Sequence, residues 1–198
     1  LYGAYALDIT EITGADSLFE AGGIISESEK NASSLFGTEE TVYSCGGSTL
    51  CIQGMLYLMK QENRCVIAGR TVHKAFLNAC ILLGLEVIWV YPDEEEGILS
   101  GKYAPEDFEK VLSEQDGEEA CVYITSPDYT GNMQDIGAIS RICRKYGAPL
   151  LVDNAHGAHL AFMEERLHPI QLGADLCCDS AHKVLPCLTG CAYIHTSN

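Results

Sequence analysis

An acidic residue and a lysine each follow an apolar run that is typical of a buried strand. The run LLVDNAHGAH (150–159) contains Asp153, and CDSAHKV (178–184) places Lys183 directly after His182. A buried carboxylate needs a cationic partner, and a ligand can supply one. A desolvated lysine can act as an amine nucleophile toward a carbonyl. Each signal is weak alone, because strand-end aspartates also cap the following segment and most lysines lie in solvent.

A third stretch, CGGSTLCIQG (45–54), has the composition of an anion-binding loop. An expected strand runs into Gly46-Gly47, and Ser48-Thr49 opens an expected helix. Backbone N–H groups at a helix start, with small residues and hydroxyls around them, can hold a phosphate. The stretch matches neither a G-x-G-x-x-G motif nor a P-loop. Taken alone, a helix cap by Ser48 is the simpler interpretation.

A metal site is the alternative for the run after Asp153. His156 and His159 stand close to this aspartate in the sequence, and histidine and carboxylate are both zinc ligands. No further strong ligand stands at a familiar spacing. The sequence therefore disfavours a metal, and none is expected.

The elements that must position these residues alternate along the chain. Short apolar runs predict strands near 41–45, 64–68, 86–91, 120–125, 149–153, 174–178 and 191–195. Helices are expected at 26–36, 48–60, 73–83, 105–114 and 134–146. Such alternation predicts an α/β fold, with a mostly parallel seven-stranded sheet covered by helices on both faces. Ligands of these sheets bind beyond the carboxyl ends of the strands, where Asp153 and Lys183 are expected.

Together, the phosphate cradle, the carboxylate and the amine predict a site for pyridoxal 5'-phosphate. The cradle would hold the phosphate, and Lys183 would form a Schiff base with the aldehyde. Asp153 would keep the pyridine nitrogen protonated. The ring could then accept the electron pair left when a bond at the substrate Cα breaks.

Composition limits the classes of function. The chain has 198 residues, with 28 acidic against 12 basic residues and a net charge of −16. This length suits one domain with a full core, and so acidic a surface disfavours nucleic-acid binding. No apolar stretch approaches the ~20 residues that span a bilayer, and no leader opens the chain. A soluble, cytoplasmic protein without membrane contact is expected.

The cysteine pattern indicates neither a metal site nor a disulfide framework. The ten cysteines are scattered and include no C-x-x-C pair, so a zinc ribbon is not expected. Most stand inside apolar runs. We therefore expect reduced thiols that fill the core as small apolar side chains.

The sequence resembles the large domain of the Orn/Lys/Arg decarboxylases, which are fold-type I, pyridoxal-phosphate-dependent enzymes. The resemblance runs in collinear order through DITEITGADSLF (8–19), GGSTLCIQ, RTVHKAFLNA (70–79), YITSPDYTGN (123–132), VDNAHGAH and DSAHK. The combination of D-x-A-H-G-A-H with S-x-H-K is its specific part. It implies a three-layer α/β/α, PLP-dependent transferase-like large domain over residues 1–198.

The resemblance implies a role for several positions. Lys183 corresponds to the Schiff-base lysine, Asp153 to the partner of the pyridine nitrogen, and His73 to a histidine that stacks on the ring. As an alternative, His73 only occupies the start of a helix. Ala155 would pack on the other face of the ring, and His156 would lie beside the ring oxygen or the substrate carboxylate.

Other positions would serve the phosphate or the scaffold. Gly47, Ser48 and Thr49 correspond to the phosphate loop, and Ser180 and His182 to residues that reach the phosphate or brace the lysine. His159 is expected to buttress its loop. His168 and His195 are expected to be structural or exposed.

By this resemblance the expected activity is decarboxylation of lysine, ornithine or arginine through Lys183, in a homodimer or higher homo-oligomer. The alternatives are another reaction of the same cofactor, such as transamination or elimination, and a truncated, non-catalytic protein. The sequence departs from the family at Asp128, where a neutral hydroxyl residue is more usual, and at LFEAGG (18–23), in place of a proline-containing turn. By the resemblance, residues 1–198 are expected to lack the small C-terminal domain and an N-terminal segment of the substrate channel.

Overall fold

The computed structural model describes residues 3, 12, 14–92, 94–95, 99–115 and 119–197. In the family-like segment 8–19, residues 8–11 and 13 lie outside this part of the chain. Within the described part, none of the helices is long and apolar enough to cross a membrane.

A seven-stranded sheet forms the centre of the molecule, in the order β1-β9-β8-β7-β6-β2-β3. The neighbours from β8 to β3 pair in parallel, whereas β9 runs antiparallel to both β8 and β1. This confirms the predicted, mostly parallel sheet, and each predicted strand overlaps an observed one. The strands are β1 (Glu40–Ser44), β2 (Cys65–Gly69), β3 (Val87–Val90), β6 (Ala120–Thr125), β7 (Leu150–Asp153), β8 (Leu176–Asp179) and β9 (Ala192–Thr196).

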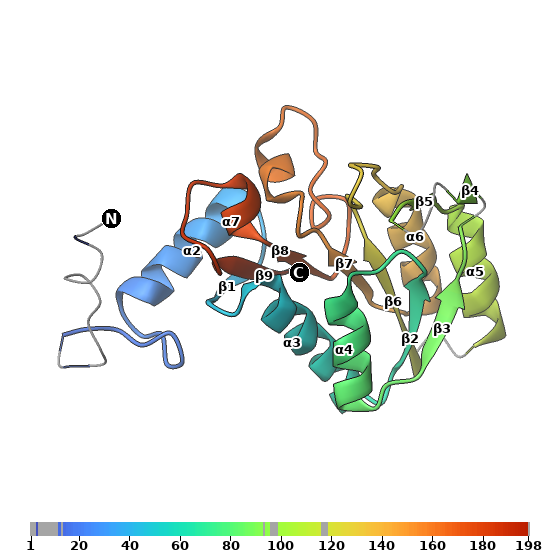
Figure 1. Ribbon diagram of the computed structural model, residues 1–198, viewed down its shortest axis with the longest axis horizontal. Helices are drawn as coiled ribbons and strands as arrows, with labels where there is room; N and C mark the ends of the chain where they lie inside the picture. Colours follow the sequence, from blue (N-terminus) through green and yellow to red (C-terminus); the bar gives the residue numbers. More distant parts are fainter. Residues whose placement is uncertain are drawn as a thin grey trace.

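Helices cover both faces of the sheet, as predicted. Figure 1 shows α3 next to α4, and α5 next to α6. The first pair packs on one face of the sheet and the second pair on the other face. Every residue of β6 and of β7 is buried, which explains why these central strands read as continuous apolar runs. The helices are α2 (Ile24–Phe36), α3 (Gly47–Gln61), α4 (Lys74–Leu83), α5 (Pro105–Glu114) and α6 (Ile136–Tyr146).

The sheet separates two apolar cores. Leu56 of α3 and Phe76 of α4 pack on one face, together with Val66 of β2. The next residue of that strand, Ile67, belongs to the other core, which contains Phe108 of α5. This alternation follows from the two-residue period of a strand.

Four short elements were not predicted. The α-helix α7 (Ala181–Val184) carries Lys183, the 3-10 helix η2 (Ala158–Phe162) follows the histidine-rich loop, and β4 (Glu94–Glu95) pairs with β5 (Gly101–Lys102). Elements of two to five residues are too short to show a hydrophobic period.

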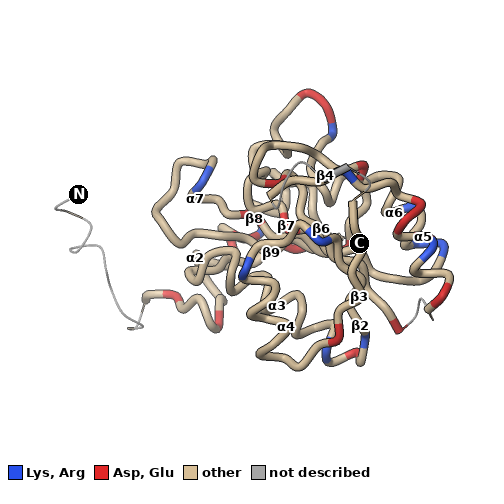
Figure 2. The backbone as a smooth tube through the Cα atoms, turned by 45° about the vertical axis from the view of Figure 1, so that its right-hand side comes forward, with Lys and Arg blue, Asp and Glu red and all other residues tan. Residues whose placement is uncertain are grey.

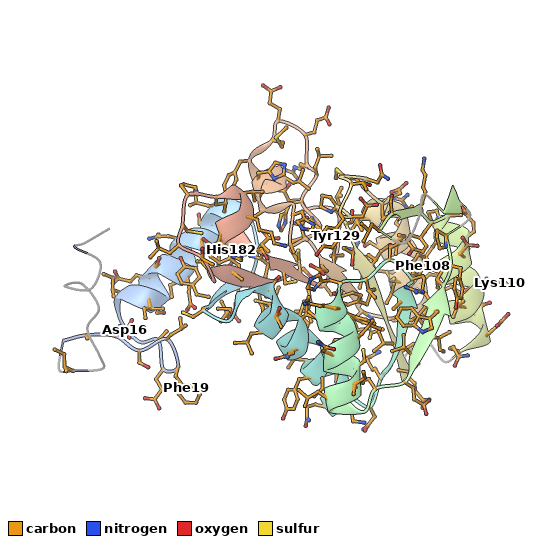
Figure 3. All side chains as sticks on the ribbon, in the orientation of Figure 1. Asp16, Phe19, Phe108, Lys110, Tyr129 and His182 are labelled. Atoms are coloured by element: carbon orange, nitrogen blue, oxygen red, sulfur yellow. The ribbon has the colours of Figure 1, made fainter. Side chains whose placement is uncertain are left out.

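The turn before α2 is held by one carboxylate. Asp16, labelled in Figure 3, accepts hydrogen bonds from the amides of Gly22 (3.2 Å), Gly23 (3.1 Å) and Ile25 (2.7 Å). The bond from Ile25 in particular lowers the pKa of this carboxyl group. Asp16 thus holds the end of the LFEAGG segment (18–23) against the start of α2.

The cysteines divide between core and surface. Cys51, Cys80, Cys121, Cys143, Cys177 and Cys178 are buried, in agreement with their predicted role as apolar filler. The prediction is wrong for Cys45 and Cys187, which are exposed. Both belong to loops rather than to strands or helices, so no apolar layer covers them.

Candidate active site

The sequence-predicted acid and amine lie at the same edge of the sheet. Asp153 is the last residue of β7, and Lys183 lies in α7, which begins just after β8 ends at Asp179. Because β7 and β8 are parallel neighbours, their carboxyl ends are adjacent. Figure 2 shows a basic residue at α7, and Lys183 is the one lysine or arginine in that helix. His73 joins them from the loop that follows β2.

Lys183 contacts His156 directly. The Lys183 Nζ atom lies 3.1 Å from Nε2 of His156. An ammonium group can only donate, so this nitrogen of the imidazole accepts. Burial, and then the charge of Lys183, lower the pKa of His156 and favour its neutral form. The pair is therefore a cation hydrogen-bonded to a neutral base.

Asp153 is a fully buried carboxylate with neutral hydrogen-bond donors. Its Oδ1 accepts from the amide of Ala155 (3.1 Å), and its Oδ2 accepts from the hydroxyl of Tyr123 (3.3 Å). Among the ion pairs of the described residues, none includes Asp153. Burial raises the pKa of this carboxyl group; the Ala155 amide and the charges of His73 and Lys183 oppose that rise. A bound cationic group would supply the missing partner.

His73 lies at the start of a helix, as its alternative interpretation expected, and its stacking on a cofactor ring stays a prediction. It is the N-cap of α4, where its Nδ1 accepts from the amide of Ala75 (3.1 Å). Burial lowers its pKa; Asp153 raises it and Lys183 lowers it. The acid, the amine and the imidazole thus act on one another across one region, as the predicted cofactor site requires.

Tyr129 was missed by the sequence analysis, although it stands inside the family-like segment 123–132. Its ring is stacked at 25° on that of His73, with 6.1 Å between centroids. It also meets the His156 ring edge-on at 5.0 Å. Figure 3 labels this side chain, which is 54% exposed. The sequence could not show this position, because His73, Tyr129 and His156 come together only in the folded chain.

The predicted phosphate loop forms the start of α3. Gly46 is the N-cap, without a side-chain cap hydrogen bond, so the interpretation of Ser48 as the cap is wrong. Instead, Ser48 Oγ accepts from Ser180 Oγ at 2.8 Å, which joins the loop to the residue before α7. A Cβ atom at Gly46 would lie 2.7 Å from Cβ of Leu50, so the close turn requires glycine. Thr49 is exposed in the first turn.

His182 braces α7. Its Nδ1 donates to the carbonyl of Cys191 (2.9 Å), and its amide donates to the same oxygen (3.2 Å). Of the two predicted roles, reaching the phosphate or bracing the lysine, this geometry matches the second. The His182 side chain is labelled in Figure 3.

The remaining predicted residues differ in environment. Ala155 is buried beside Asp153, whereas His159 is exposed on η2, so the prediction that it buttresses the loop is wrong. A 3-10 helix turns successive side chains to different sides, and position 159 faces solvent. His168 and His195 are fully buried and contact Asp179, which corresponds to the structural one of their two predicted roles.

Asp128 is buried and held by its own loop. Its Oδ1 accepts from the amides of Thr130 (2.8 Å) and Asn132 (3.0 Å), and its Oδ2 accepts from the hydroxyl of Ser100 (2.7 Å). Burial alone would raise the pKa of Asp128, but these bonds outweigh it and the pKa is lowered. Asp128 is therefore an anion whose oxygens are already hydrogen-bonded.

Comparisons with known proteins show the family of the chain. Residues 2–198 match the family described as Orn/Lys/Arg decarboxylase, major domain. The protein named "Uncharacterized protein YaaO" of Bacillus subtilis is 31% identical over 193 residues, 97% of this chain and 40% of that protein. An arginine decarboxylase of Bacillus cereus is 31% identical over 191 residues, 95% of this chain and 41% of that protein. The chain thus spans about 40% of the length of the relatives that it matches.

Solved structures show the same fold at low sequence identity. The structure of the SepCysS–SepCysE N-terminal domain complex matches with a TM-score of 0.76 and 16% identity, over 93% of this chain and 48% of that chain. Mouse CSAD matches with a TM-score of 0.73 and 21% identity, over 88% of this chain and 41% of that chain. By its match over residues 2–198, the chain belongs to the Orn/Lys/Arg decarboxylase family and corresponds to the major domain of that family.

Proposed function

We propose that this chain is the cofactor-binding domain of a pyridoxal-phosphate-dependent decarboxylase that acts on a basic amino acid, namely lysine, ornithine or arginine. The observation that carries the proposal is the buried carboxylate of Asp153, which has only neutral hydrogen-bond donors and faces the region of Lys183 and His73. The family supports decarboxylation, and relatives named arginine decarboxylase support a basic substrate. A net charge of −16 favours the approach of cationic molecules.

The residues present fit this cofactor. When bound, pyridoxal phosphate supplies an aldehyde that reacts with amines and a ring that accepts the electron pair from a broken Cα bond. Asp153 would hold a proton at the pyridine nitrogen, because a buried carboxylate stabilises a cation beside it. The first turn of α3, with Ser48 and its bonded partner Ser180, would receive the phosphate. His73 and Ala155 would pack on the two faces of the ring.

Lys183 and His156 form a hydrogen-bonded pair. The neutral imidazole accepts the bond from the ammonium group at 3.1 Å and would so orient Nζ. A lysine that has given up its proton is an amine nucleophile that can attack a carbonyl. Because the pKa of His156 is lowered, its imidazole would orient this amine rather than take its proton.

Cofactor capture by Lys183 tests the proposal. The purified chain is incubated with pyridoxal phosphate, reduced with borohydride, digested and mapped by mass spectrometry. We expect the phosphopyridoxyl mass on the Lys183 peptide, and its loss in Lys183→Ala. Lys74→Ala is the matched control, because Lys74 is an exposed lysine beside His73 and the label on Lys183 should persist. A label spread evenly over exposed lysines would contradict the assignment.

The reaction itself is tested by products. Carbon dioxide and diamine release from lysine or ornithine, or agmatine release from arginine, would support decarboxylation. Keto-acid formation without carbon dioxide would replace it with transamination. Specific labelling of Lys183 without turnover of any substrate would favour the non-catalytic alternative.

A further inference from the structure

A second buried carboxylate lies one strand away from Asp153 and has a different set of partners. Both oxygens of Asp179 are in hydrogen bonds, and its side chain is fully buried. Its Oδ1 accepts from Asn154 Nδ2 at 2.6 Å and faces Cys177 Sγ at 3.7 Å. Its Oδ2 lies 3.1 Å from Nε2 of His168 and 3.2 Å from Nε2 of His195.

These contacts make Asp179 an anion in the folded protein. Burial alone would raise its pKa, but the hydrogen bonds from His168 and His195 outweigh burial and hold the pKa well below its usual range. A carboxylate can only accept, so each imidazole presents an Nε2–H to it. The Nδ1 atom of His195 lies 2.9 Å from the hydroxyl of Thr41, which ties the cluster to β1.

The position of Asp179 relates the cluster to the candidate active site. Asp179 ends β8 and directly precedes Ser180 and α7, the helix that carries Lys183. Asn154 directly follows Asp153 at the end of β7, and its backbone N–H donates to the backbone carbonyl of Cys178 at 2.9 Å. The bond between the Asn154 and Asp179 side chains therefore joins two strand ends. One is the end of β7, which carries Asp153, and the other is the end of β8, which leads to Lys183.

We propose that Asp179 is a positioning residue: anchored by His168 and His195, it holds Asn154 and thereby sets the position of Asp153 relative to Lys183. The ladder between β7 and β8 ends at the pair Asp153–Cys178 and the backbone bond from Asn154 to Cys178, so the side-chain bond between Asn154 and Asp179 is the next link between the two strand ends. The inference deepens the proposed function and relies on it for its catalytic consequence. A catalytic constellation needs such support, because small displacements of its groups are costly.

A metal ion is the competing explanation of the same residues. Donor atoms of His168, Cys177 and Asp179 lie within 4.8 Å of one another, among the described residues. Both oxygens of Asp179, however, already accept bonds from protonated donors, which accounts for the cluster without a metal. Metal content is therefore one readout of the test.

The same two strands provide a matched control. At their opposite ends, the Asp175 carboxylate accepts from the amide of Leu150 at 2.7 Å. Asp175→Asn thus alters a carboxylate bond between the two strands at the ends opposite to Asp153. Asp179→Asn alters the carboxylate bond to Asn154, next to Asp153. Asn154→Ala is a second variant, which removes one donor and leaves the Asp179 anion with its histidines.

The first readout is the pKa of His156, followed by NMR of its imidazole in the cofactor-free protein. Burial and the charge of Lys183 lower this pKa, and Asp153 raises it. If α7 shifts, the effect of Lys183 weakens, and we expect the pKa of His156 to rise in Asp179→Asn and Asn154→Ala but not in Asp175→Asn. Loss of the Asp179 charge alone would act in the opposite direction, because removing an anion lowers the pKa of an imidazole.

The second readout is the affinity for pyridoxal phosphate, measured by titration. We expect binding about 10- to 100-fold weaker in Asp179→Asn and Asn154→Ala, and essentially unchanged in Asp175→Asn. Thermal unfolding of each variant separates a general loss of stability from this local effect.

Three outcomes would overturn the inference. The first is an unchanged His156 pKa and unchanged affinity in both test variants. The second is an equal effect of Asp175→Asn. The third is a stoichiometric metal that the Asp179 variant loses. If the wild-type chain captures no cofactor at Lys183, the proposed function fails, while the His156 titration still decides the positioning role.

Discussion

At the scale of single residues, two buried aspartates at neighbouring strand ends have opposite electrostatic environments. Asp179 meets two imidazole N–H groups, and its pKa is held well below its usual range. Asp153 meets a backbone amide and a phenol, and burial raises its pKa. The first carboxylate is therefore satisfied by the protein, and the second would be satisfied by a cationic ligand. This difference indicates which of the two belongs to the chemistry.

Asp153→Asn should therefore stabilise the cofactor-free protein while it lowers turnover. Because the folded pKa of Asp153 is raised above 3.8, its ionisation costs stability as the pH rises through the folded pKa. Asparagine carries no charge, so the variant should gain about 0.5–2 kcal/mol at pH 7 and nothing below the ordinary pKa. Urea unfolding at a series of pH values measures the gain. Turnover should fall at least about 100-fold, because the charge opposite the ring is lost.

Asp128→Asn is the control for this result. Its hydrogen bonds outweigh burial and lower the pKa of Asp128, so its ionised form contributes stability above pH 3.8, and that contribution is lost as the pH falls through the folded pKa. The asparagine variant should therefore be less stable than the wild type at neutral pH. A stability gain in both variants would show that removal of any acidic residue from this chain is stabilising, and the argument for Asp153 would fail.

At the scale of elements, the helix starts direct side chains and amides to the carboxyl edge of the sheet. The helix α4 begins with a histidine that is both cap and site residue, and α3 begins with glycine and leaves its first turn without a side-chain cap. The helix α6 has an ordinary cap: Asp135 Oδ1 accepts from the amide of Ala138 at 2.9 Å. The starts of α4 and α6 are thus both capped by a side chain, whereas the start of α3 is not.

Asp135→Ala should destabilise the fold by about 1 kcal/mol without an effect on cofactor capture, because the N-cap bond that is lost joins Asp135 to its own helix. Asp135→Asn keeps an oxygen acceptor at this position and should retain nearly all of the stability. Urea midpoints of the two variants measure the difference. Equal losses in both would mean that the charge, and not the cap hydrogen bond, stabilises α6.

At the scale of the whole molecule, one sheet is shared by two cores. Val66 and Ile67 are adjacent on β2 and belong to opposite cores, so neither core can form without the strands of the other. Trp89, the one tryptophan of the chain, packs against the core of α3 and α4. The fluorescence of Trp89 therefore reports on the unfolding of that core when a residue of the other core is substituted.

Phe108→Ala should lower stability by about 3–5 kcal/mol, because it empties a fully buried site in the core of α5 and α6. Trp89 fluorescence and far-UV circular dichroism should shift to the same lower urea midpoint. Leu77→Ala, on the exposed side of α4, should change stability by less than about 0.5 kcal/mol. Separate midpoints for the two probes would show that the cores unfold independently.

The sequence by itself determined the parts of this protein that depend on local pattern. Apolar runs of four to six residues and helical periodicity predicted every strand of the large sheet and its covering helices. The signal is continuous in β6 and β7, which are buried on both faces. The strand-end positions of Asp153 and Lys183 followed from the same pattern. The family-like motifs added His73 and His156, which no period could have identified.

Tertiary structure alone decided which polar groups meet. Asp179 contacts residues 11, 16 and 25 positions away along the chain, and sequence patterns do not show contacts between segments so far apart. The direction of a side chain in a short element, such as His159 on η2 or His182 in α7, depends on one turn of backbone and its packing. The sequence therefore placed the candidate chemistry at one edge of the sheet. The packing of loops and strand ends decided which carboxylate is satisfied by the protein and which remains available to a ligand.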